Sequence, residues 1–248
     1  TKGYAVASAG LAAFLLFSAY LDKVKERLGL PLTVELPINL ASVDVFVGAL
    51  MGVMLVFLFS SLAIRAVGRA AGTIIDEVRQ QFRNDPGIMA GTSRPDYGRA
   101  VDITARAALR EMVLPGILAV GMPVTVGLIF RFARDTALPL GPNCCDDSGG
   151  WLAVAGLLMV GTIGGIILAT VLNNGGGAWD NAKKYIEAGK LKDENGAVVL
   201  TGSEIHAAAV VGDTVGDPFK DTAGPSLHVL VKLLSTITLV LAPLFIAS

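Results

Sequence analysis

The stretch VFVGALMGVMLVFLFSSLAI, Val45–Ile64, contains twenty consecutive residues without a charged side chain. An α-helix rises 1.5 Å per residue, and about 20 helical residues cross the hydrocarbon core of a bilayer. This block therefore predicts a membrane-spanning helix.

Four further blocks have the same character: Gly3–Leu21, Met112–Phe130, the glycine-rich Trp151–Leu172, and Leu227–Ala247. We therefore expect an all-α protein, a polytopic transmembrane helix bundle with five spanning helices and four polar connections. The arrangement of the apolar residues decides this, because their share of the chain, 53%, is near that of many soluble domains. We expect a single membrane domain over residues 1–248, with the two termini on opposite sides of the bilayer.

Basic side chains are distributed unevenly among the four connections. One pair of connections carries twelve of them: Arg65, Arg69, Arg79, Arg83, Arg94, Arg99, Arg106, Arg110, Lys183, Lys184, Lys190 and Lys192. The other pair carries five: Lys23, Lys25, Arg27, Arg131 and Arg134. The positive-inside rule puts the richer pair, residues 65–111 and 173–206, in the cytoplasm and the C-terminus outside. We expect an integral, multi-pass protein of a bacterial cell membrane.

Two of the helices are predicted to be longer than the membrane is thick. After the second block, RAVGRAAGTIIDEVRQQFR keeps helical spacing with no breaker before Pro86, and a second long helix runs from about Ala207 to Phe245. Each would be roughly 60 Å long, about twice the hydrocarbon thickness. Such cytoplasmic extensions favour a site outside the bilayer. Asp76 and Glu77, within the first extension, are expected to be structural ion-pair partners of Arg79.

Three aspartates stand one helical turn apart in the segment GDTVGDPFKDTAGP, Gly212–Pro225. Asp213, Asp217 and Asp221 would share one face of an α-helix, where like charges repel by several tenths of a kcal/mol per pair. A cation would relieve that repulsion, and Mg²⁺ prefers carboxylate oxygens and accompanies phosphate. Lys220 would then meet phosphate oxygens as a point charge. The alternative is a solvated helix with a charged face.

A second charged segment, WDNAKKYIE, follows the fourth block. Two acids and two lysines share one face of a helix there: Asp180, Lys183, Lys184 and Glu187. Taken alone, this pattern is typical of an ordinary surface helix. The preceding run NNGGG, Asn173–Gly177, lacks the spacing of a phosphate-binding P-loop. Because both charged segments are predicted at the cytoplasmic mouth of the bundle, together they favour a polyanion bound through metal ions.

Lys232 lies inside the last apolar block. A lysine at such a depth costs about 2.5–3.5 kcal/mol on insertion scales unless it snorkels or has a partner. We interpret it as an ion-pathway group that faces the bundle interior. His228, one turn earlier, either shares that path or is a structural donor. His206 is expected at a helix start without a chemical role, and the adjacent Cys144 and Cys145 are expected to have none, an intermolecular link being the alternative.

Four stretches of this sequence resemble the membrane-bound pyrophosphatases, which couple hydrolysis of inorganic pyrophosphate to transport of H⁺ or Na⁺. They are DNAKKYIE, GDTVGDPFKDTAGPSL, DEVRQQF…PGIMAG and DYGRAVDI…REMVLPG. The family has sixteen spans, and this chain resembles its last five, roughly the final third. The resemblance therefore implies an ion-translocating diphosphatase fragment, truncated before Thr1 and inactive on its own.

The resemblance also implies roles for particular residues. The expected Mg²⁺ ligands are Asp180, Asp213, Asp217 and Asp221. The lysines expected to contact pyrophosphate are Lys183, Lys184 and Lys220. Asp217, Asp221 and Lys220 are the expected catalytic residues, and Lys232 matches the lysine of an ion gate. One departure is His228, where many relatives carry asparagine.

The expected partners are the Mg–pyrophosphate complex, the transported H⁺, membrane lipid and a second copy of the chain. TKGYA at the start resembles the K⁺-independent subfamily, which implies a potassium-independent proton pump, with a Na⁺ pump as the alternative. A secondary transporter or channel is disfavoured because most acids lie beyond the apolar blocks, and a non-catalytic membrane subunit would not explain the stacked aspartates. Since 20 Lys and Arg nearly balance 21 Asp and Glu, no nucleic-acid partner is expected.

Overall fold

The computed structural model describes residues 2–36, 38–135 and 149–246. Its elements, in chain order, are α1 (Lys2–Arg27), α2 (Val43–Asn84), α3 (Pro86–Met89), α4 (Tyr97–Glu111), α5 (Val113–Asp135), α6 (Gly149–Glu187), α7 (Glu204–Asp217), the π-helix η1 (Pro218–Ala223) and α8 (Gly224–Phe245). Within the described residues the only β-structure is an isolated bridge between Lys192 and Val198. Thr1, Cys144 and Cys145 lie outside the described residues.

Five helical stretches are long and apolar enough to cross a membrane: Lys2–Arg27, Val43–Asn84, Tyr97–Ala133, Gly150–Glu187 and Glu204–Phe245. Each corresponds to one of the five predicted blocks. The predicted all-α, multi-pass bundle is therefore confirmed. The lengths of the two long helices are confirmed as well: α2 runs for 42 residues and ends just before Pro86, and α7, η1 and α8 follow one another without a break from Glu204 to Phe245.

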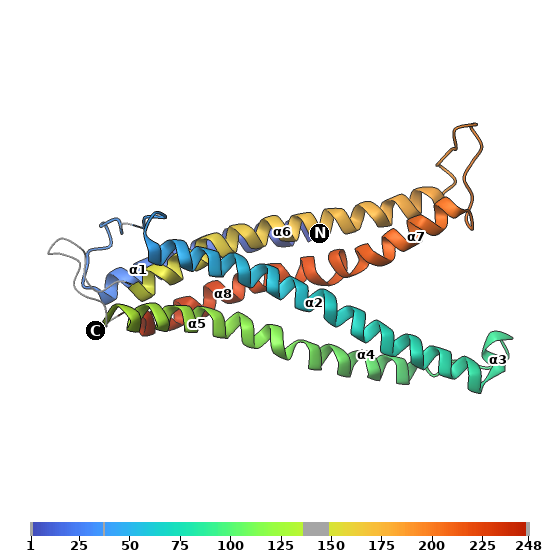
Figure 1. The fold of residues 1–248 in the computed structure, drawn as a ribbon, viewed down its shortest axis with the longest axis horizontal. Helices are drawn as coiled ribbons and strands as arrows, with labels where there is room; N and C mark the ends of the chain where they lie inside the picture. Colours follow the sequence, from blue (N-terminus) through green and yellow to red (C-terminus); the bar gives the residue numbers. More distant parts are fainter. Residues whose placement is uncertain (1, 37, 136–148, 247–248) are drawn as a thin grey trace.

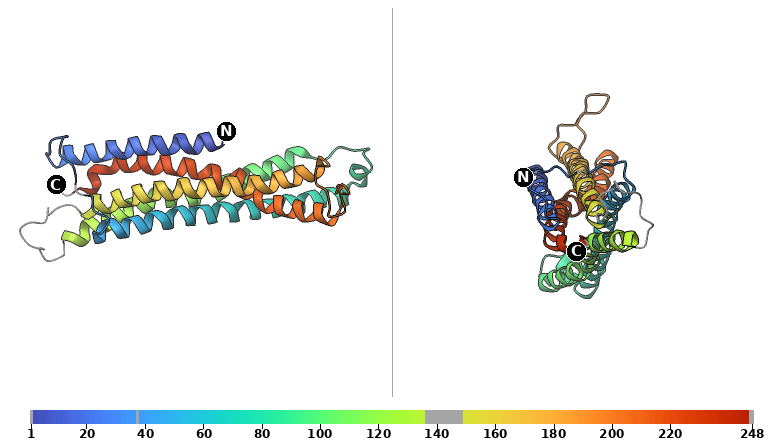
Figure 2. Two further views of the ribbon diagram at one scale, coloured as in Figure 1. Left: turned by 90° about the horizontal axis from the view of Figure 1, so that it is seen from above. Right: turned by 90° about the vertical axis from the view of Figure 1, so that its left-hand side faces the viewer.

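The helices form an elongated bundle that separates into two arms. At the end of the bundle where α8 ends, α1 packs against α6 and α8, while α5 and α8 pack against the adjoining halves of α2 and α6 (Figures 1 and 2). Beyond that point α2 and α4 continue as one arm, capped by α3, while α6 and α7 form the other. The connections 85–96 and 188–203, both predicted as cytoplasmic, lie at the same end of the molecule (Figure 1).

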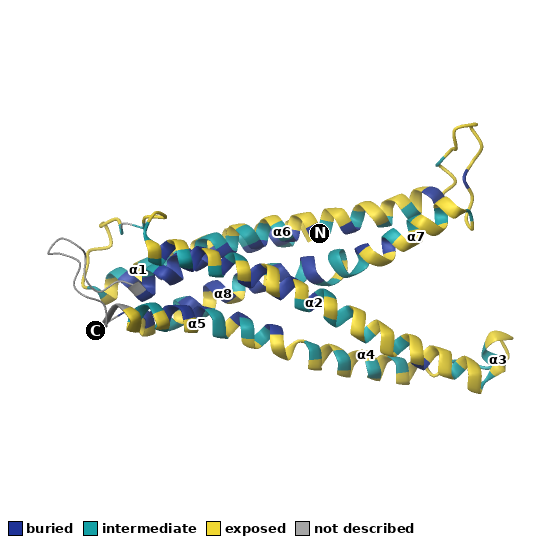
Figure 3. Cartoon of the chain, in the orientation of Figure 1, coloured by how far each residue is buried: buried dark blue, intermediate teal, exposed yellow. Residues whose placement is uncertain are grey.

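Glycines bring α2 and α6 into backbone contact inside the bundle. A methyl group on Gly48 would fall on the carbonyl oxygen of Ala153, and one on Gly52 would fall on that of Leu157. Small residues of this kind let transmembrane helices approach closely. Buried side chains concentrate where the five spans meet, whereas the arms are largely exposed (Figure 3).

Ion pairs hold α4 against the α2 extension. Two nitrogens of the Arg69 guanidinium on α2 donate to the Glu111 carboxylate on α4, and this hydrogen bonding holds the pKa of Glu111 below its usual value. At the other end of α4, the backbone N–H of Asp96 donates to the side-chain oxygen of Gln81 on α2 at 2.9 Å. The arm is thus a helical hairpin fastened near both of its ends.

The two acids expected to pair with Arg79 differ in their surroundings. Asp76 does pair with Arg79, at 4.0 Å on the surface, as predicted. Glu77 is 6% exposed and instead meets Arg99 of α4 at 2.9 Å, while the amide of Gln81 donates to it at 3.0 Å. The prediction that Glu77 is structural is supported, but its partner is on another helix.

The last long helix is not a regular α-helix throughout. Proline has no N–H to donate, so Pro218 leaves a gap in the hydrogen-bond ladder. The chain forms the π turn η1 there, and the N–H of Gly224 donates five residues back, to the carbonyl of Phe219. Such turns interrupt the α-helical period, often at functional sites. The expected one-turn spacing of the three aspartates therefore breaks between Asp217 and Asp221.

Candidate functional site

The two charged segments meet because α6 and α7 touch through glycines. The run Asn173–Gly177 is part of helix α6 and forms no loop. A methyl group on Gly176 would lie 2.8 Å from the Cβ of Lys220, and one on Gly216 would lie 3.0 Å from the Cα of Gly176. Only residues without side chains permit this backbone contact. It places the side chains that follow on α6 against those of α7 and η1.

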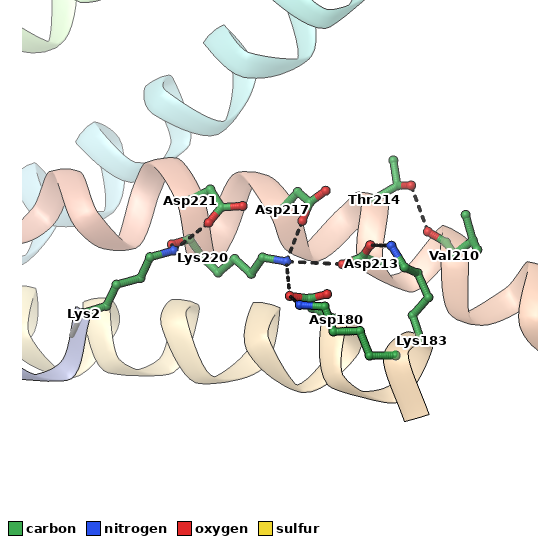
Figure 4. Close-up of polar contacts among 10 residues, drawn as sticks. Lys2, Asp180, Lys183, Val210, Asp213, Thr214, Asp217, Lys220 and Asp221 are labelled. Carbon is green, nitrogen blue, oxygen red and sulfur yellow. Dashed lines mark hydrogen bonds and ion pairs between the residues drawn. The ribbon is translucent and has the colours of Figure 1, made fainter. Parts of the chain in front are cut away.

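Three carboxylates from two helices converge on the ammonium group of Lys220 (Figure 4). Its Nζ lies 2.7 Å from Asp217, 3.0 Å from Asp180 and 3.3 Å from Asp213. The side chains of Lys220 and Asp213 are 14% and 9% exposed. We call Asp180, Lys183, Lys184, Asp213, Asp217 and Lys220 the carboxylate–lysine cluster.

Two further lysines complete the cluster from α6. Lys183 crosses to α7 and donates to Asp213 at 2.6 Å, and Lys184 donates to Asp180 within α6 at 2.9 Å. Asp213 and Asp180 are thus each shared between Lys220 and one lysine of α6. The structure brings together six of the seven residues predicted to bind metal or substrate, and each carboxylate in the cluster pairs with at least one lysine. The roles of these residues remain predictions.

Hydrogen bonding keeps Asp180, Asp213 and Lys220 charged. Hydrogen bonds from Lys184 and then Lys220 lower the pKa of Asp180 to about 2, against the effect of desolvation. The hydrogen bond from Lys183 likewise lowers the pKa of Asp213. Burial works against the charge on Lys220, but its bonds to Asp217, Asp180 and Asp213 outweigh burial and raise its pKa. Asp180, Asp213 and Lys220 are therefore ionised at neutral pH.

Asp221 is the predicted site residue that the cluster does not include. Its carboxylate accepts a hydrogen bond at 2.6 Å from Lys2, at the start of α1 (Figure 4). The π turn between Asp217 and Asp221 changes the rotation of the chain at that point, so Asp221 does not share the face of Asp213 and Asp217. Sequence reasoning missed Lys2. The only signal for it was a lysine directly ahead of the first apolar block.

The cluster has the donor chemistry that Mg²⁺ uses, although it is not a closed metal cage. Among the described residues, no group of three or more His, Cys, Asp and Glu is arranged to hold a metal ion. Mg²⁺ is usually bound through one or two carboxylates together with water and substrate phosphates. The carboxylates of Asp180, Asp213 and Asp217 all lie near the ammonium group of Lys220. Any two of them would therefore supply the one or two carboxylate ligands that a magnesium ion uses.

Lys232 and the two histidines lie away from the cluster. Lys232 is partly buried in α8, and no partner for its ammonium group is found among the described residues. The Nδ1 atom of His228 is buried and has no hydrogen-bond partner among the described residues. The expected helix-start position of His206 is confirmed: its backbone N–H bonds the Ser203 cap, and its ring meets Glu187 at 3.3 Å.

Comparison with known proteins identifies the family. Residues 1–241 match the family described as inorganic H⁺ pyrophosphatase. The chain is 57% identical over 245 residues, 99% of its length, to a K(+)-insensitive pyrophosphate-energized proton pump of Caldanaerobacter subterraneus. It is 52% identical over 246 residues, also 99% of its length, to the pyrophosphate-energized membrane proton pump 3 of Arabidopsis thaliana.

A relative named as a K(+)-stimulated pyrophosphate-energized sodium pump, from Clostridium tetani, is 44% identical over 242 residues, 98% of this chain. The chain spans about a third of the length of these relatives: 31% of the Caldanaerobacter protein, 29% of the Arabidopsis protein and 31% of the Clostridium protein. The match over residues 1–241 and the five apolar helices agree with the resemblance carried by the two charged segments. The chain therefore belongs to the inorganic H⁺ pyrophosphatase family.

Proposed function

We propose that this chain supplies part of the substrate site and of the ion path of a pump that hydrolyses Mg-pyrophosphate and transports protons. The observation that carries the proposal is the carboxylate–lysine cluster at the point where the two arms leave the apolar bundle. The names of the 57% and 52% identical relatives, both proton pumps, support the same activity. Because the chain covers about a third of those proteins, the rest of the site would come from other segments.

The charges of the cluster suit a metal-bound polyanion. Mg²⁺, when bound, would neutralise the diphosphate and leave its phosphorus open to attack by water. Asp213 and Asp180, 9% and 19% exposed, would anchor the metal side of the complex, while Asp217, 50% exposed, remains accessible to it. The ammonium groups of Lys183, Lys184 and Lys220 would meet the phosphate oxygens as point charges.

Proton transport would use the same helix that carries three members of the cluster. Lys232 follows Asp213 by 19 positions on the α7–η1–α8 rod, roughly 28 Å along its axis. We propose that Lys232 is the gate, and that the cluster lies on the cytoplasmic side. The identity to the relative named as a sodium pump is 44%, lower than the 57% and 52% identities to the two relatives named as proton pumps. This difference supports H⁺ as the ion and a K⁺-independent mechanism. The expected homodimer remains a prediction of the resemblance.

The hydrolytic role is tested in the full-length protein. Asp217→Ala and Lys184→Ala should abolish Mg²⁺-dependent release of phosphate from pyrophosphate, since each removes a charge that the complex needs. Glu194→Ala is the matched control, because Glu194 is an exposed acid in the connection 188–203 and should leave the rate unchanged. Full activity in both cluster variants would remove these residues from the site.

The choice of ion is tested with the same protein in sealed vesicles. Addition of Mg-pyrophosphate should acidify the vesicle interior in a buffer without sodium or potassium, followed with a pH-sensitive dye. A signal that appears only when Na⁺ is supplied would favour the sodium pump. Hydrolysis without movement of either ion would contradict the transport part of the proposal.

A further inference from the structure

Trp179 lies immediately before Asp180 on α6, and its indole rests on two glycines of α7. A methyl group on Gly216 would lie 2.9 Å from Cε3 of the indole, and one on Gly212 would lie 3.3 Å from Cδ1. Gly212 and Gly216 are one helical turn apart, so their bare backbones form a flat surface under the ring. The indole therefore occupies space that two side chains would otherwise fill.

An aromatic contact extends this packing to the π turn. The ring of Phe219 lies 6.3 Å from that of Trp179, centroid to centroid, with the planes tilted by 39°. Offset and tilted aromatic pairs at such separations are favourable. Phe219 directly precedes Lys220, just as Trp179 directly precedes Asp180. The two rings are thus attached next to the two residues whose side chains meet at 3.0 Å.

The Trp179 side chain is 41% exposed, so burial in a hydrophobic core does not explain why a tryptophan occupies this position. Its packed face sets how far apart and at what rotation α6 and α7 lie, beside the direct backbone contact of Gly176 with Gly216. We propose that Trp179 is a positioning residue, whose indole acts as a spacer that brings Asp180 to Lys220 and Lys183 to Asp213. The proposal rests on the proposed function wherever hydrolysis is measured.

The test is an exchange of size across the contact in the full-length protein. Trp179→Ala removes the spacer, and Gly212→Ala drives a methyl group into it, because the three atoms nearest to that methyl all belong to the indole. Each should lower kcat for Mg-pyrophosphate by on the order of tenfold to a hundredfold, with a smaller change in KM, because misplacement by about 1 Å costs rate more than binding. Trp179→Phe should retain most of the activity, and Gly212→Ala should cause no further loss of kcat when Trp179 is already alanine.

Gly177→Ala is the matched control, since a methyl group there meets no atom within 4 Å, and its kcat should equal that of the parent protein. A kcat unchanged in Trp179→Ala and Gly212→Ala, with the distance between α6 and α7 also unchanged, would overturn the proposal. So would a loss in Gly212→Ala that persists in full when Trp179 is alanine, because the loss would then not arise from contact with the ring.

A distance measurement separates this proposal from the proposed function. Spin labels are attached at Tyr185→Cys on α6 and Val211→Cys on α7, both exposed positions, in a background without other cysteines. Gly212→Ala should lengthen the mean label separation when Trp179 is present, and it should leave the separation unchanged when Trp179 is alanine. Unchanged separations would overturn the spacer whatever the hydrolysis rate. Altered separations with unaltered hydrolysis would confirm the spacer and overturn the catalytic role of the cluster.

Discussion

Gly175, Gly176 and Gly177 are adjacent and chemically identical, yet only the middle one is needed for contact between helices. A methyl group on Gly175 or Gly177 would meet nothing within 4 Å, whereas one on Gly176 would press on Lys220. The difference arises because helical residues point in directions about 100° apart, and one of the three directions faces α7 and η1. A pattern of letters cannot distinguish the three positions.

We therefore expect Gly176→Ala to destabilise the protein by about 1–3 kcal/mol through overpacking. Gly175→Ala and Gly177→Ala should be neutral or stabilising by up to about 1 kcal/mol, because alanine is the better helix former. Thermal unfolding of the three variants in detergent compares them directly. Equal midpoints for all three would show that α6 and α7 do not touch at Gly176.

The depressed pKa of Asp180 sets a pH range for its contribution to stability. Its pKa is about 2 in the folded protein, below the ordinary 3.8. The ion pairs of Asp180 thus stabilise fully above about pH 4 and are lost as the pH falls through about 2. Lys220 has a raised pKa, so its contribution is complete below its ordinary value of 10.5 and is lost only above that pH.

Asp180→Asn should accordingly lower the unfolding midpoint by the same amount at pH 5, 7 and 9. The difference from the parent protein should shrink as the pH falls from about 4 to about 2 and disappear below that, where the folded carboxylate is protonated and is neutral like the amide. Unfolding midpoints across this series test the assignment. A difference that already shrinks between pH 7 and 5 would mean that Asp180 is not held ionised by Lys184 and Lys220.

At the scale of elements, the α2–α4 hairpin depends on contacts between residues far apart in sequence. Helical periodicity correctly predicts that α2 continues past the membrane to Asn84. It does not indicate that Glu77 turns inward to Arg99 while its neighbour Asp76 stays on the surface. The rotation of α2 about its own axis decides which of the two acids faces α4.

Glu77→Ala should therefore cost about 1–3 kcal/mol, because it removes the buried, hydrogen-bonded carboxylate that joins α2 to Arg99 of α4. Asp76→Ala removes an exposed i,i+3 pair and should change stability by less than about 0.5 kcal/mol. Comparison of their unfolding free energies uses two adjacent acids as each other's control. Similar effects of both changes would contradict the inward position of Glu77.

For the whole molecule, the alternation of five spans separates the connections into two groups. Residues 85–96 and 188–203 lie at one end, and residues 28–36 and 38–42 with the end of α8 lie at the other (Figure 1). The uneven distribution of basic residues predicts that the first group is cytoplasmic. The carboxylate–lysine cluster would then open toward the cytoplasm.

Single cysteines at Glu194 and Thr33, in a cysteine-free background, test this orientation. A membrane-impermeant maleimide should label Glu194→Cys only from the cytoplasmic side and Thr33→Cys only from the opposite side. Both positions are exposed, so access by the reagent is not limited by burial. Labelling of both from one side would contradict the odd number of spans between them, and a reversed result would contradict the positive-inside assignment.

The sequence by itself determined the number of spans, the long extensions and most members of the cluster. These follow from local properties: the length of an apolar run, and the spacing of charges along one helix. Lys232 belongs to the same class, since a lysine within an apolar block is visible without any structure.

Only the tertiary structure decided which partners meet. Asp221 turns to Lys2 and away from the cluster because a proline-induced π turn changes the helical period at that point. Trp179 becomes a spacer because two glycines 33 and 37 residues later present bare backbone to it. Such contacts depend on the relative rotation and separation of packed helices. Those quantities arise from the whole set of interhelical contacts, and no single segment of the chain encodes them.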